Sequence, residues 1–383
     1  MEKTSKTKTR QKRLCNNIVI NQLSITHYQK PKKMSSKIRI LSLDGGGIRG
    51  IISCVILKYI EEQLQQQDNP NAKIGDYFDL ISGTSTGGLI TALLLFPDGN
   101  KNAKYSVEEA LNLYAKKGSD IFNVSFFEHL LNPFGLLKEK ISDKNLEKQL
   151  EEVFGNLELK QLTKPCLITS YDITARKAQL FTSHNATQPI KNFYVKDVCR
   201  ATSAAPTYFE PAQIKSLYKQ QFTLIDGGVY ANNPALCAYA EARKIEFSKA
   251  LNNPQKKDFP TVNDMIIISV GTGTVLKPYK FEDFDNAGKL KWISPLIDIL
   301  LSSNVETVDY QLKKMYETLS NRNAKNYHRL MPNLINASPE MDDTSAKNIK
   351  NLIQDGLTFI NQNQNELDII VKKIINKTCE RNI

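Results

Sequence analysis

The sequence predicts an α/β protein of three layers, in which a mostly parallel central sheet lies between two layers of helices. Short apolar runs of strand length alternate with longer segments whose apolar residues recur at helical spacing, from residue 37 to about residue 290. A unit of strand, glycine turn and helix occurs twice in succession, at 37–67 and at 77–96. Alternation of this kind is typical of a parallel sheet with helices on both faces.

The two repeated units can be followed in chain order. Residues 37–43 (KIRILSL) predict a buried strand, and residues 48–67 predict the helix that follows it. Residues 77–83 (YFDLISG) and 86–96 (TGGLITALLLF) predict a second buried strand and a second buried helix. Glycines separate strand from helix in both units, which predicts a tight turn in each.

The same two patterns recur further along the chain. Beyond about residue 290 the pattern is chiefly helical, except that residues 327–332 (YHRLMP) predict a last strand. The other expected helices are 106–117, 143–154 and 233–245, the last with Pro234 in its first turn, and the other expected strands are 165–173, 178–183, 222–228 and 265–273.

The chain divides into a basic extension and one domain. Its 383 residues are 41% hydrophobic, enough to fill one large core, and neither an internal repeat nor a linker divides residues 37–383. Residues 1–37 hold ten Lys and Arg against one acid, so they contribute +9 of the net charge of +11. We expect residues 1–36 to be disordered, either as a solvated arm or as an electrostatic tether to an anionic membrane. The near-neutral remainder argues against a nucleic-acid-binding domain.

Several other classes are disfavoured by what the sequence lacks. No stretch approaches the roughly 20 apolar residues of a membrane span, and no apolar secretory segment opens the chain, so we expect a cytoplasmic protein. Peripheral membrane contact and export without a classical signal stay open. The six cysteines have no C-x-x-C spacing and the four histidines form no cluster, so we expect no protein-held metal.

The glycine loop after the first strand has three interpretations. Gly45, Gly47 and Gly50 satisfy G-x-G-x-x-G, but a dinucleotide site calls for an acid at the end of the second strand, where Ser82 and Thr84 flank a glycine. The P-loop pattern is absent. The third interpretation is a cradle of backbone N–H groups for an oxyanion, beside the N-terminus of a helix. Nearby, Arg49 could hold this loop, assist with a phosphate, or form a surface salt bridge.

A nucleophile is predicted at the second turn. Gly83, Ser85 and Gly87 satisfy G-x-S-x-G between a buried strand and a buried helix. In a nucleophile elbow the serine occupies a strained turn, and glycines flank it because side chains would collide with neighbouring backbone.

The base that activates this serine has several candidates. His27, His129 and His184 lie in settings typical of structural or surface histidines, and His328 alone fits the order Ser, Asp, His of an ordinary α/β-hydrolase. A further candidate is Asp226, which ends a predicted strand and is followed by Gly227 and Gly228, leaving its carboxylate approachable. Asp44 also precedes glycines and competes for the role.

Three motifs in this order, DGGGIRG at 44–50, GTSTGG at 83–88 and DGG at 226–228, resemble the patatin-like phospholipases, which are mechanistically similar to the cytosolic phospholipase A2 catalytic domain. The segments ATSAAPTYFEP, IISVGTG and VDYQLKKMYETLSNRNAKNYHRL are also similar to plant patatins, so the resemblance covers roughly residues 37–375. Two departures are the lysine-rich arm in place of a secretory signal, and Asp-Gly-Gly where plant forms often have Asp-Gly-Ala.

The resemblance implies a Ser-Asp dyad on a modified α/β-hydrolase sheet. Ser85 is then the nucleophile and Asp226 the base, in preference to Asp44, because the family pattern tolerates other residue types at that position. It also implies an oxyanion hole and a set of supporting motif residues. The implied oxyanion residues are Gly45, Gly46 and Gly47, and the supporting residues are Arg49, Gly50, Gly83, Gly87, Gly227 and Gly228.

The implied activity is acyl-ester hydrolysis of glycerophospholipids and lysophospholipids at a membrane surface, of phospholipase A type, through an acyl-enzyme and without metal or organic cofactor. Three alternatives stay open: a non-catalytic lipid-binding or storage protein of the same fold, an esterase that uses His328, and a dinucleotide-binding oxidoreductase. Head group, acyl position and any activating protein partner are also open. Residues 121–137 and 291–301, the latter with Trp292, are either core segments or membrane contacts.

Overall fold

The computed structural model describes residues 37–113, 143–274, 278–285 and 288–375. The extension predicted over residues 1–36 and the apolar segment 121–137 therefore lie outside the described residues. Within the described ranges, no helix has the length and apolar character needed to cross a membrane.

The centre of the fold is an eight-stranded sheet in the order β5-β6-β3-β2-β1-β7-β8, with β4 also paired to β3. The pairs β3–β2, β2–β1, β1–β7 and β7–β8 are parallel, whereas β3–β4, β3–β6 and β5–β6 are antiparallel. The prediction of a mostly parallel sheet is thus confirmed, with antiparallel strands at one side. The strands are β1 Ile38–Leu43, β2 Leu80–Thr84, β3 Cys166–Asp172, β4 Lys177–Thr182, β5 Ala212–Lys215, β6 Gln221–Asp226, β7 Met265–Val270 and β8 Tyr327–Leu330.

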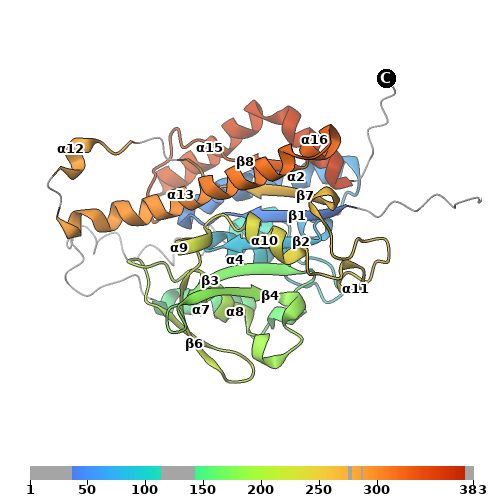
Figure 1. The fold of residues 1–383 in the computed structure, drawn as a ribbon, viewed down its shortest axis with the longest axis horizontal. Coiled ribbons are helices and arrows are strands. Elements are labelled where there is room, and N and C mark those ends of the chain that lie inside the picture. The colour runs from blue at the N-terminus through green and yellow to red at the C-terminus, as the bar shows by residue number, and fades with distance from the viewer. Residues whose placement is uncertain (1–36, 114–142, 275–277, 286–287, 376–383) are drawn as a thin grey trace, which may run out of the picture. The chain divides into compact units, whose positions relative to one another are not determined.

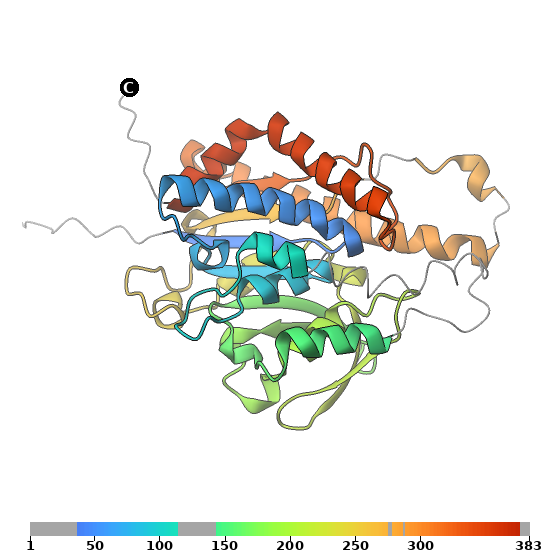
Figure 2. The same cartoon turned by 180° about the vertical axis from the view of Figure 1, so that it is seen from behind.

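Helices cover both faces of this sheet, as the three-layer prediction expects. Figure 1 views the sheet from the side of α9, α10 and α13, and Figure 2 from the side of α2 and α4. The helices are α2 Gly50–Gln67, α3 Ile74–Tyr77, α4 Thr86–Leu94, α7 Asp143–Phe154, α8 Val195–Thr202, α9 Gly228–Ala231, α10 Ala235–Ala242, α11 Phe247–Ala250, α12 Phe281–Phe284, α13 Lys289–Glu317, α14 Asn321–Ala324, α15 Ala346–Gln362 and α16 Gln364–Ile375.

The strand sequences explain the two cores. Alternate residues of β1 point to opposite faces, so Ile38 and Ile40 pack with α10 and α13, whereas Leu41 and Leu43 pack in the cluster that contains α2 and α4. Because both faces of the central strands are buried, these strands are continuously apolar, which is the signal from which they were predicted. All the predicted strands are present, and β5 and α8 are additional elements.

The catalytic candidates are brought together by the way β2 and β6 share one edge of β3. Strand β4 pairs with β3 along 167–172 and occupies its other edge. On the shared edge, Thr84 of β2 lies opposite Thr169, and Asp226 of β6 lies opposite the next residue, Ser170. Because a strand has only two edges, β2 and the antiparallel β6 meet there with their carboxyl ends facing each other. Ser85 follows Thr84 directly at this junction.

Candidate active site

Ser85 occupies a strained turn between β2 and α4. Its backbone has φ 54° and ψ −124°, a region that residues with a side chain rarely adopt. A Cβ added to Gly83 would lie 2.1 Å from the Gly87 carbonyl oxygen, and one added to Gly87 would lie 2.2 Å from that of Leu43. The two flanking glycines are therefore required by close backbone packing, which accounts for the G-x-S-x-G pattern.

Hydrogen bonds hold this turn in place. The Ser85 N–H donates to the Thr202 hydroxyl at 2.9 Å, and that hydroxyl donates to the Thr169 carbonyl oxygen at 2.6 Å. The first turn of α4 begins at the serine, because the Leu89 N–H donates to the Ser85 carbonyl oxygen at 3.1 Å. The strained backbone is thus fixed by α8 on one side and by α4 on the other.

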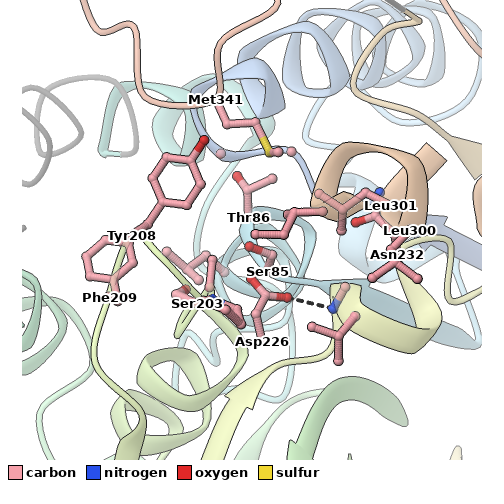
Figure 3. A pocket seen from close by; sticks show the side chains of 18 of the residues that line it. Ser85, Thr86, Ser203, Tyr208, Phe209, Asp226, Asn232, Leu300, Leu301 and Met341 are labelled. Atoms are coloured by element: carbon pink, nitrogen blue, oxygen red, sulfur yellow. Dashed lines mark hydrogen bonds between the residues drawn. The ribbon is translucent and has the colours of Figure 1, made fainter. Parts of the chain in front are cut away.

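Asp226 lies beside the Ser85 side chain at the end of β6 (Figure 3). The carboxylate is buried, and its Oδ1 accepts a hydrogen bond of 2.7 Å from the Gly228 N–H. Burial raises the pKa of Asp226 to about 6, although hydrogen bonds from Ser85 and Gly228 act in the opposite direction. A Cβ added to Gly227 would lie 2.1 Å from the Thr169 hydroxyl oxygen. The residue that follows Asp226 must therefore be a glycine.

The glycine loop after β1 forms another side of the site. Gly46 and Gly47 line the cavity that contains Ser85 and Asp226. The Gly45 N–H instead donates to the Asn232 carbonyl oxygen at 3.1 Å, so this amide is already engaged within the protein. A Cβ added to Gly45 would lie 2.4 Å from the Asn232 side-chain oxygen. Three glycines were expected to supply amides to the oxyanion. The N–H of Gly45 is bound to Asn232 instead, and its lack of a side chain lets the loop pack closely against Asn232.

Arg49 and Gly50 follow this loop where α2 begins. Arg49 is buried, and its Nε donates to the Gly46 carbonyl oxygen at 3.3 Å, so the side chain reaches back to the loop and does not form a surface salt bridge. Burial lowers the pKa of Arg49. A Cβ added to Gly50 would lie 2.5 Å from the Thr86 hydroxyl oxygen, so this glycine lets the starts of α2 and α4 approach each other.

The competing bases lie elsewhere. Asp44 is buried in a bidentate ion pair with Arg329 of β8 and does not line the cavity. His328 is held by Glu366 at 3.3 Å and Lys373 at 2.9 Å, and burial lowers its pKa. No histidine of the described ranges lines the cavity, His184 being paired with Glu241 at 3.0 Å; His27 and His129 fall outside those ranges.

The walls of the cavity are mainly apolar. Ser85 and Asp226 line the cavity together with side chains from α4, α7, α13 and the segment after α8. Figure 3 shows Tyr208, Leu301 and Met341 on different sides of Ser85. In the part of the chain that the structure describes, no group of three or more His, Cys, Asp or Glu is placed to hold a metal ion. The apolar lining residues include Leu89, Leu146, Pro206, Phe209, Val229, Ile297, Leu300, Leu301 and Met341.

Sequence reasoning did not identify the residues that support the site. Thr202 fixes the Ser85 turn, and the Thr272 hydroxyl donates to the Gly45 carbonyl oxygen at 2.8 Å. Asn232 accepts from Gly45 and lines the cavity. A signal was present in two cases, because Thr202 belongs to the segment ATSAAPTYFEP and Thr272 to the segment IISVGTG, both of which resemble plant patatins.

Comparisons with known proteins show which family, relatives and solved structures this chain resembles. The family model described as "Patatin-like phospholipase" matches residues 41–239. Patatin-like protein 2 of Oryza sativa subsp. indica is 32% identical over 360 residues, which cover 88% of this chain and 87% of that protein. "Probable inactive patatin-3-Kuras 1" of Solanum tuberosum is 33% identical over 345 residues, with coverage of 87% and 89%. The solved structure of human GIVD cytosolic phospholipase A2 has a TM-score of 0.45 and 9% identity, over 96% of this chain and 64% of that chain.

Proposed function

The chain belongs to the patatin-like phospholipase family, and we propose that it is a lipid acyl hydrolase of phospholipase A or lysophospholipase type. Its proposed substrates are fatty-acyl esters of glycerophospholipids at a lipid surface. The observation that carries the proposal is the position of the strained Ser85 beside the buried carboxylate of Asp226, both of which line a mainly apolar cavity.

In the proposed first step, Asp226 takes the Ser85 proton while the hydroxyl oxygen attacks the ester carbonyl carbon. The carbonyl π electrons move to oxygen and form a tetrahedral oxyanion. When this intermediate collapses, the C–O bond to the glycerol breaks and the departing oxygen receives the proton from Asp226. A fatty-acyl ester of Ser85 remains, and water attacks it with the same carboxylate as base, which releases the fatty acid.

The oxyanion is proposed to be stabilised by backbone amides of the loop at Gly46 and Gly47, both of which line the cavity. Arg49 assists by bonding the Gly46 carbonyl oxygen and so fixing the orientation of the adjoining peptide. The apolar walls suit a fatty-acyl chain, since they offer few polar groups that its burial would leave unpaired. The proposed steps use side chains, backbone amides and water.

The test is hydrolysis of a mixed-phospholipid substrate, with released fatty acids identified by mass spectrometry. We expect Ser85→Ala and Asp226→Asn each to lower kcat by at least about 10³-fold. Ser203→Ala is the matched control, because Ser203 also lines the cavity but is given no chemical role, and it should retain turnover.

One alternative within the family is a non-catalytic lipid-binding or storage protein, for which the potato relative described as "Probable inactive patatin-3-Kuras 1" is a precedent. That alternative predicts lipid binding without turnover in the wild type. Near-normal turnover in either Ser85→Ala or Asp226→Asn would overturn the proposed dyad.

A further inference from the structure

Exposed apolar side chains gather on α12 and the first half of α13. Phe281 of α12 is 78% exposed, and Leu296 and Leu300 of α13 are 48% and 51% exposed. Tyr279, two residues before Phe281, and Ile299 of α13 are 48% and 38% exposed. We call these five residues the α12–α13 apolar surface. A cluster of large apolar side chains in water is unusual for a protein surface and indicates a contact with a partner or a lipid phase.

This surface is continuous with the wall of the active-site cavity. Leu296, Ile299 and Leu300 follow the i, i+3, i+4 spacing and therefore form one stripe along α13. Ile297 and Leu301, which lie on the neighbouring stripe, line the cavity. Leu300 belongs to both groups, since it lines the cavity and is also exposed. A molecule that leaves the cavity past Leu300 therefore meets an apolar exterior.

The apolar character of this part of α13 is not explained by core packing. The second half of the helix contributes Val308, Leu312 and Tyr316 to a buried cluster, whereas neither core cluster includes a residue of the first half among those whose side chains the structure describes. In both Figure 1 and Figure 2, α12 and the first half of α13 reach beyond the strands, at the end of the sheet where α9 lies.

Aromatic contacts attach α12 to α13. The ring centroids of Phe284 and Trp292 are 4.3 Å apart, and those of Tyr279 and Phe284 are 5.4 Å apart. The Tyr279 hydroxyl donates to Asp298 at 2.9 Å. Within residues 291–301, Trp292 thus packs against Phe284 of α12, whereas Leu296, Ile299 and Leu300 are exposed.

We propose that the α12–α13 apolar surface inserts into a zwitterionic phospholipid bilayer, so that the cavity opens toward the lipid phase. The inference rests on the proposed function for its choice of a lipid partner. Residues 279–301 contain three lysines and four acidic residues, so this region carries no excess of positive charge that would select anionic lipids. Apolar insertion therefore drives the binding.

The test is sedimentation of the full-length Ser85→Ala protein with phosphatidylcholine vesicles. The double variant Phe281→Ser/Leu296→Ser changes two exposed residues that do not line the cavity, and it should lower vesicle partitioning at least about tenfold. The control variant Tyr218→Ser/Leu357→Ser removes side chains that are 70% and 44% exposed elsewhere on the fold, and its partitioning should stay within about twofold of the parent.

Activity measurements separate this inference from the proposed function. For activity measurements the protein retains Ser85. In this protein, Phe281→Ser/Leu296→Ser should lower hydrolysis of phosphatidylcholine vesicles at least about tenfold and leave hydrolysis of monomeric p-nitrophenyl butyrate unchanged. If the wild type cleaves neither ester, the proposed function fails, while the sedimentation result still decides the inference.

Three outcomes would overturn the inference. The first is equal phosphatidylcholine binding by the parent and by Phe281→Ser/Leu296→Ser. The second is binding that requires phosphatidylserine and is lost at high salt, which would assign it to basic residues. The third is a change from dimer to monomer in the double variant without vesicles, which would assign the surface to a second copy of the chain.

Discussion

Replacement of Asp226 by Asn should inactivate the protein and at the same time stabilise its fold. The carboxylate is buried, and burial raises its pKa from 3.8 to about 6. The amide oxygen of Asn can still accept the hydrogen bond from the Gly228 N–H, which is 2.7 Å from Oδ1. The substitution therefore removes the buried charge and leaves the local acceptor in place.

The magnitude follows from the two pKa values. Between about pH 4 and pH 6 the folded protein holds the Asp226 proton and the unfolded chain releases it, so folding stability falls as pH rises through this window. Above about pH 6 the group is charged in both states and the full difference opposes folding. At about 1.4 kcal/mol for each pKa unit, the difference between 3.8 and about 6 corresponds to about 3 kcal/mol.

The assay is thermal unfolding of wild type and Asp226→Asn at pH 4 and pH 7.5. A domain of this length has an unfolding entropy of about 0.7 kcal/mol/K, so about 3 kcal/mol raises Tm by about 4 °C at pH 7.5, with little difference at pH 4. Asp355→Asn is the contrasting control, because Asp355 accepts bonds from the N–H groups of Ile335, Asn336 and Ala337, and its replacement should lower Tm. A lower Tm of Asp226→Asn at pH 7.5, or retained lipid turnover, would refute the reasoning.

Three further predictions concern the geometry of the site. Because Asp226 must be ionised to take the Ser85 proton, kcat/KM should rise with pH through about 6, and a flat profile between pH 5 and pH 8 would contradict its role as base. Gly46→Ala places a Cβ 2.2 Å from the Thr272 hydroxyl oxygen and should lower kcat about 10²- to 10³-fold, whereas Gly288→Ala, whose Cβ meets nothing within 4 Å, should be active; equal kcat in both would show that the loop position is unimportant. Thr202→Val leaves the Ser85 N–H without its acceptor and should destabilise the fold by about 1–3 kcal/mol, measured by denaturant unfolding; an unchanged midpoint would show that this bond does not support the turn.

The strands and the Ser85 turn could be predicted because their constraints are local. The central strands are apolar on both faces, so length and composition identify them without knowledge of their partners. The glycines at 83 and 87 are required by contacts within the turn or with the end of the adjacent strand. Only glycine satisfies these contacts, so the requirement can be recognised from the residue types alone. A pattern of this kind needs no long-range information.

Asp226 reaches Ser85 through an antiparallel strand, whereas the sequence predicted a mostly parallel sheet. Residues 222–228 show a strand that ends in a carboxylate, but they do not show the direction in which the strand runs. In the structure β6 is antiparallel to β3, and Asp226 reaches Ser85 because β6 occupies the part of the β3 edge that β2 leaves open. Strand direction depends on pairing between distant segments, which periodicity within one segment cannot reveal.

The same limit applies to Gly45 and Asp44. Three consecutive glycines do not indicate which amide faces the cavity, because the acceptor of the Gly45 N–H is Asn232, far along the chain. Likewise, Asp44 and Asp226 look equivalent in the sequence, because both precede glycines. Only the structure shows that β8 places Arg329 beside Asp44. The two aspartates differ in their distant neighbours: Asp44 is paired with the guanidinium of Arg329, whereas Asp226 lies beside the side chain of Ser85.

The head-on meeting of β2 and β6 links the strain of the serine to the proton affinity of its base. Two strands that end against each other on one edge of β3 leave little room for a side chain at Gly227, where an added Cβ would lie 2.1 Å from the Thr169 hydroxyl oxygen. The same lack of room excludes water from the carboxylate, and burial is the cause that raises the pKa of Asp226 to about 6. A base with this pKa is ionised at neutral pH and still has a higher proton affinity than an ordinary aspartate. Substitutions that open the junction should therefore relax the turn and lower the pKa of Asp226 together.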